Sequence, residues 1–118
     1  MTPKTIIGAG VIALALLGAA DAMAAAPVDM VQIAVARTPA DHEAIAKAYE
    51  DEATELSEKA AAHARMAESY KSLASASKHV YSGSVAHCAA LSRELNAAAK
   101  ESRALAELHH ALARSATK

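Results

Sequence analysis

Cysteine and the large aromatic residues are almost missing from this chain of 118 residues, which has one cysteine, no tryptophan and no phenylalanine. A single cysteine excludes a disulfide within the chain. Without tryptophan or phenylalanine, any hydrophobic core must be built from aliphatic residues, alanine and three tyrosines. Stability must therefore come from helix packing, a bound metal or association with another chain.

Patterns that mark the common enzyme and cofactor classes are also missing. No CxxC, HxxxH or CxxCH pattern occurs, so standard zinc sites and covalently attached haem are excluded. Glu107-Leu-His-His110 has the Glu-x-x-His spacing of carboxylate-bridged di-iron bundles, but the chain holds one copy, away from the leucine face. We therefore do not expect an enzyme.

The formal net charge is −1, which gives no electrostatic reason to expect nucleic acid or an anionic membrane as a partner. The charges are unevenly spread, however. Between Asp41 and Glu58 the only base is Lys47, whereas Arg103 and Arg114 lie near the C-terminus. This asymmetry favours an antiparallel arrangement of two helices, in which the acidic and basic ends lie side by side.

Glycine and proline nearly vanish after Pro39, since Gly83 is the only one of either type between Pro39 and the end. Helix-favouring residues dominate this region. Thr38 can cap a helix that starts at Pro39, with Asp41 at the capping-box position. We expect an all-α fold, a long antiparallel hairpin with helices over about 39–75 and 84–115 joined by a serine-rich turn.

The first part of the chain has the features of a secretory signal: Lys4, an apolar run from Thr5 to Ala20, and small residues up to Ala24. A transmembrane anchor is the alternative, but the run is shorter than the about 20 residues that a span needs. We expect a signal peptide at 1–24, a lead-in at 25–37 and the hairpin domain at 38–118. The lead-in fits a short strand, a short helix or an extended strap. The mature protein would be periplasmic or secreted, with no membrane span.

Apolar residues follow one another at steps of three and four along both expected helices, as in a coiled coil. The seams comprise His42, Ile45, Tyr49, Glu52, Leu56, Lys59, His63, Met66, Tyr70 and Leu73, and Cys88, Leu91, Leu95, Ala98, Ser102, Leu105, His109 and Leu112. Polar groups interrupt both seams, so one hairpin alone has a thin core. We expect two copies to associate as a homodimeric four-helix bundle, in which alanine allows the helix axes to lie close together.

Helical geometry turns several histidines toward these seams. His87 and His63 are expected to point inward near the closed end of the hairpin, together with Met66 and with Cys88 at the edge of the seam, whereas His110 faces out. Imidazole, thiol and thioether together suit copper first and zinc second. A second, weaker metal site would use His42 and His109, and packing is the alternative role for each inward histidine.

Cys88 could instead bridge two chains through a disulfide or serve as a small packing residue. The sequence thus supports two functions. The first is an exported protein that binds a copper or zinc ion for storage, delivery or sensing. The alternative is a structural or chaperone-like envelope protein without metal, acting on a partner protein through its amphipathic helices.

Overall fold

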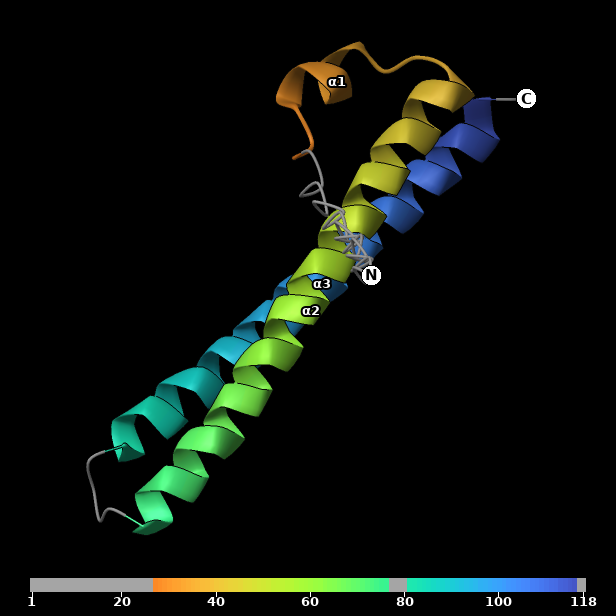
Figure 1. The fold of residues 1–118 in the computed structure, drawn as a ribbon. Helices are drawn as coiled ribbons and strands as arrows, with labels where there is room; N and C mark the ends of the chain where they lie inside the picture. The colour runs from red at the N-terminus through yellow and green to blue at the C-terminus, as the bar shows by residue number, and fades with distance from the viewer. Residues whose placement is uncertain (1–26, 77–80, 117–118) are drawn as a thin grey trace, which may run out of the picture.

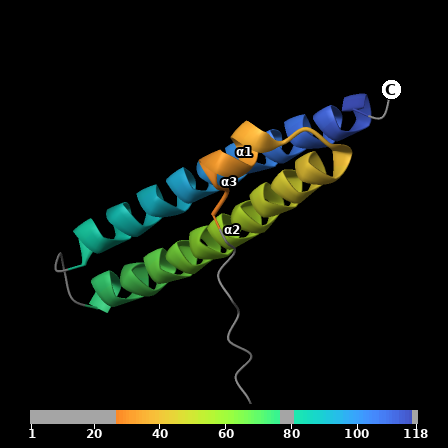
Figure 2. The ribbon, with the colours of Figure 1, turned by 90° about the horizontal axis from the view of Figure 1, so that it is seen from above.

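The computed structural model describes residues 27–76 and 81–116, and the regular structure in these ranges is entirely helical. A short helix, α1 (Met30–Val35), precedes two long ones, α2 (Pro39–Ala76) and α3 (Ser82–Ala116). The long helices run antiparallel and pack against each other along their length (Figures 1 and 2). The predicted all-α hairpin is confirmed, with helix ends within two residues of those expected. The expected signal peptide at 1–24 lies outside the described residues.

A capping box fixes the start of α2. Thr38 Oγ1 accepts a hydrogen bond from the Asp41 backbone N–H at 3.1 Å. Asp41 Oδ2 accepts in return from the backbone N–H groups of Arg37 and Thr38, both at 2.9 Å. These hydrogen bonds hold the pKa of the Asp41 carboxyl below its usual value, because they stabilise the charged form. The cap predicted at Thr38 is therefore present.

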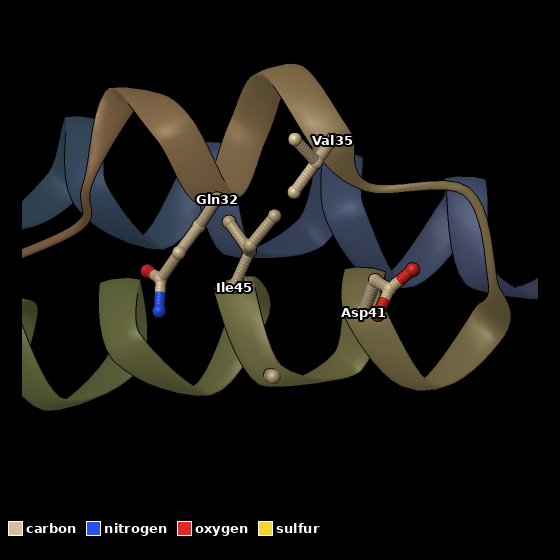
Figure 3. A pocket seen from close by; sticks show the side chains of 5 residues that line it. Gln32, Val35, Asp41 and Ile45 are labelled. Atoms are coloured by element: carbon tan, nitrogen blue, oxygen red, sulfur yellow. The ribbon is translucent and has the colours of Figure 1, made fainter.

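The lead-in forms a short helix that lies against α2. Asp29 caps α1, with Gln32 completing a capping box. Gln32 and Val35 of α1 lie on either side of Ile45 of α2 in the close view of Figure 3. Ile45 is only 2% exposed, although the large apolar side chains of α1 itself remain exposed. Of the three forms that the sequence allowed for the lead-in, the structure adopts the helix.

Alanine forms the contact between the long helices. The buried alanines recur every seven residues; they are Ala46, Ala53, Ala60 and Ala67 on α2, and Ala99, Ala106 and Ala113 on α3. A seven-residue repeat keeps one stripe of each helix facing its partner. Side chains this small allow helix axes to approach toward the lower end of the usual range of about 8–10 Å.

The larger apolar residues lie mostly outside this contact, contrary to the sequence-based seam. Five residues expected in the seam are 39–49% exposed, namely Met66, Leu73, Leu91, Leu105 and Leu112. The physical reason is the close approach of the helices: the space between them admits alanine, and the residue just before each position of the alanine stripe lies at the edge. Ile45, before Ala46, is the exception, because α1 lies against it. The sequence predicts that alanine allows helix axes to lie close together in a bundle of two copies. It does not predict that alanine also forms the core of a single hairpin.

A second row of partly buried residues alternates with the alanines. On α2 these residues are His42, Tyr49, Leu56, His63 and Tyr70. On α3 they are Cys88, Leu95 and His109, with the buried Ser102 in the same row. His42 faces His109 at one end of the hairpin, and Tyr70 faces Tyr81 at the other. Each step of seven along α2 corresponds to a step of seven back along α3. This register places His63 and Cys88 in one layer of the contact.

Candidate functional site

Two histidines meet at the open end of the hairpin, where α2 begins and α3 ends. The Nδ1 atoms of His42 and His109 are 3.2 Å apart, and the ring centroids are separated by 5.4 Å. The ring of Tyr49 lies next to His109, at a centroid distance of 5.9 Å. All three side chains are partly buried. The structure therefore brings together the two residues of the second predicted metal site.

The protonation state of this pair follows from its geometry. Two nitrogen atoms at this distance can share one proton in an N–H···N hydrogen bond, but two protonated rings would repel each other. Burial lowers the pKa of His109, and the neighbouring His42 lowers it further. These causes favour neutral imidazole at His109, which is the form that offers a lone pair to a metal ion.

His110 lies beside this pair and binds two carboxylates of α2. Its Nδ1 is 2.8 Å from Glu43 Oε2, and its Nε2 is 2.8 Å from Glu50 Oε1. The hydrogen bond with Glu50, followed by contact with Glu43, raises the pKa of His110. The expectation that His110 faces away from the hairpin is wrong, because the helix edge on which it lies adjoins the acidic stretch of α2. The clustering of acids between 41 and 58 was the signal that could have revealed this contact.

Of the four residues of the first predicted site, two lie in the inward rows and two are exposed. His63 is partly buried, and its Nδ1 is buried without a hydrogen-bond partner. Cys88 is a free, partly buried cysteine in the same layer. His87 is exposed, so its predicted inward position is wrong, and Met66 is 40% exposed. The reason is that Cys88 occupies the inward row of α3, which directs the preceding residue away from α2.

Within residues 27–76 and 81–116, no three side chains of histidine, cysteine, aspartate or glutamate are grouped so that they could hold a metal ion. Among these four residue types, the described helices therefore bring together at most two side chains that could share a metal ion. His42 and His109 are the pair whose nitrogen atoms are in direct contact.

The other prominent feature is an exposed apolar row along one edge of the hairpin. We define the apolar row as Met66 and Leu73 of α2 and Leu91, Leu105 and Leu112 of α3, each at the position just before the inward stripe. Leu108, which is 61% exposed, lies one turn from Leu105 and Leu112 on α3. Near the middle of the row, Lys59 is paired with Glu55 at 2.9 Å. The charge at that point is thus neutralised within the chain.

None of the three described helices has the combination of length and apolar character required to cross a bilayer. No protein-family model, curated protein or solved structure matches the chain. The functional argument therefore depends on the two features above, the histidine pair and the apolar row.

Proposed function

We propose that this protein is an exported structural or chaperone-like hairpin that pairs with a second copy through its apolar row, forming a four-helix bundle. One observation supports this proposal most directly: the large aliphatic side chains of the long helices lie mainly at the edge, whereas the contact within the hairpin is built from alanine. In the proposed dimer, the second copy covers these exposed leucines.

The apolar row carries enough surface for reversible pairing. Covering the exposed part of each leucine or methionine contributes on the order of 1 kcal/mol. A dimer that covers the five row residues and Leu108 of each copy then gains on the order of 10 kcal/mol, comparable with the about 4–15 kcal/mol that association costs. These magnitudes favour a reversible dimer over a permanent one.

A second copy is the occupant that matches the apolar row best. The row has members on both long helices, spaced by seven or fourteen residues, and an identical hairpin presents a face of the same length and period. The Lys59–Glu55 pair within each chain also limits repulsion between like charges when two copies meet. Two hairpins joined in this way correspond to a four-helix bundle.

Export is supported by the sequence of residues 1–24, with its basic start, apolar run and small residues. Mass spectrometry of the protein recovered from the cell envelope tests this part of the proposal, because it shows whether the signal has been removed. Loss of residues 1–24 is expected, and an uncleaved chain in the cytoplasm would contradict it.

The dependence of the melting temperature on protein concentration tests pairing. If folding is coupled to association, the melting temperature of the unaltered protein rises with concentration. Leu105→Lys should remove this dependence, because it places a charge in the apolar row. The matched control is Ala104→Lys, one residue earlier on an exposed position of the same helix. A melting temperature that does not change with concentration in the unaltered protein would refute pairing.

The prediction of metal binding through His63, Met66, His87 and Cys88 remains a prediction, although the exposure of His87 and Met66 weakens its geometric basis. The histidine pair at the open end gives metal binding a better foundation.

A further inference from the structure

We propose that His42 and His109 form a binding site for a transition-metal ion, copper(II) or zinc, which joins α2 to α3 at the open end of the hairpin. This inference is independent of pairing between copies, because both ligands belong to one chain.

The separation of the two nitrogen atoms supports the site. Imidazole nitrogen binds zinc at about 2.0–2.1 Å, so two such ligands on one tetrahedral ion lie about 3.3–3.4 Å apart. The Nδ1 atoms of His42 and His109 are 3.2 Å apart. An ion that replaces the hydrogen bond between the rings would therefore require the rings to rotate, but not the two helices to separate.

Packing holds both rings in place before an ion arrives. His42 lies in the first turns of α2, whose start is fixed by the capping box of Thr38 and Asp41. His109 lies between the buried Ala106 and Ala113 of α3, and Tyr49 packs against its ring. Ligands that are already ordered lose little conformational entropy on binding, which increases affinity.

The chemistry of the ligands determines the class of ion. Two imidazole nitrogens suit copper(II), nickel and zinc, whereas calcium and magnesium prefer oxygen ligands. The carboxylates of Glu43, which adjoins His42, and Glu50, which adjoins Tyr49, are already engaged by His110. With two protein ligands, the remaining coordination positions would be filled by water or by a small molecule. We therefore expect an open, exchangeable site.

Calorimetric titration of the purified, untagged protein, first stripped with a chelator, tests the proposal. Copper(II) sulfate and zinc sulfate are the probes, and one ion is expected to bind per chain. His42→Gln and His109→Gln should each weaken binding about tenfold or more, because each removes one of the two ligands. The matched control is Lys100→Gln, which changes an exposed residue of α3 that is not a candidate ligand. Absence of binding, or equal affinity in all variants, would overturn the site.

A measurement on the unaltered protein avoids the risk that a variant fails to fold. Zinc should shift the imidazole NMR signals of His42 and His109. Signals of His42 and His109 that do not respond to saturating zinc would overturn the proposal, even if zinc binds elsewhere. Sedimentation of the same samples shows whether the copies are paired, so failure of the metal site and failure of pairing can be distinguished.

Discussion

Tyr70 of α2 and Tyr81, which directly precedes α3, stack across the closed end of the hairpin, with ring centroids 5.8 Å apart and planes inclined by 30°. This stack occupies the same type of layer as the His42–His109 pair at the other end. The two ring pairs follow the same register over the length of the hairpin. The register in turn places the candidate metal ligands opposite each other.

The energy of this stack can be measured with a double-mutant cycle. We expect Tyr70→Ala and Tyr81→Ala to be coupled by about 0.5–1.5 kcal/mol in the free energy of unfolding, because aromatic pairs contribute this much beyond their buried area. Urea unfolding followed by circular dichroism provides the measurement. A control cycle combines Tyr49→Ala with Tyr81→Ala, whose side chains lie near opposite ends of the hairpin. Additive effects of Tyr70 and Tyr81 would contradict the stack.

Enlarging a buried alanine should destabilise the hairpin. Ala60 is fully buried in the stripe of α2. We expect Ala60→Leu to reduce the free energy of unfolding by about 1–3 kcal/mol, since the added side chain must force the helices apart. Ala61→Leu is the matched control, because Ala61 is exposed, and it should change the stability by less than about 0.5 kcal/mol. Equal effects in urea titrations would show that the alanine stripe is not the core.

The contact of His110 with two acids predicts a dependence of stability on pH. The pKa of His110 in the folded chain is raised above the ordinary value of 6.5. Its contribution to stability should therefore be fully present below the unfolded pKa and should be lost as the pH rises through the folded pKa. We expect His110→Gln to melt at a lower temperature than the parent at about pH 5.5, and the difference to shrink above the folded pKa.

A chelator in both samples keeps metal binding out of this comparison, and His87→Gln controls for the loss of an exposed histidine. Titration of the His110 ring by NMR gives the pKa directly. A midpoint at or below 6.5 would contradict the contact with Glu43 and Glu50.

The helices and their antiparallel order were predictable because they depend on local signals. Thr38 and Pro39 determine the start of α2, and the scarcity of glycine and proline predicts its length. The core was harder to predict, because a search for large apolar side chains selects Leu91, Leu105 and Leu112. The regular spacing of Ala46, Ala53, Ala60 and Ala67 was visible in the sequence, but the burial of alanine depends on how closely the axes approach, which is a property of the folded pair.

The candidate site was predictable in part for the same reason. An antiparallel register places His42 near His109, and the structure brings them into contact. Whether His87 points inward depends on whether His87 or Cys88 occupies the inward row of α3. The two side chains point in directions about 100° apart around the helix axis. The seam expected from the sequence places the leucines of α3 at the centre of the face that meets α2. The stripe that carries Ala99 and Ala106 is the actual centre, so His87 was placed inward in error.

Sedimentation equilibrium of the unaltered protein at micromolar concentration tests the central claim most directly. The proposed pairing through the apolar row predicts a mass that approaches twice that of one chain as the concentration rises. A well-folded helical species with the mass of a single chain over the whole concentration range would contradict it.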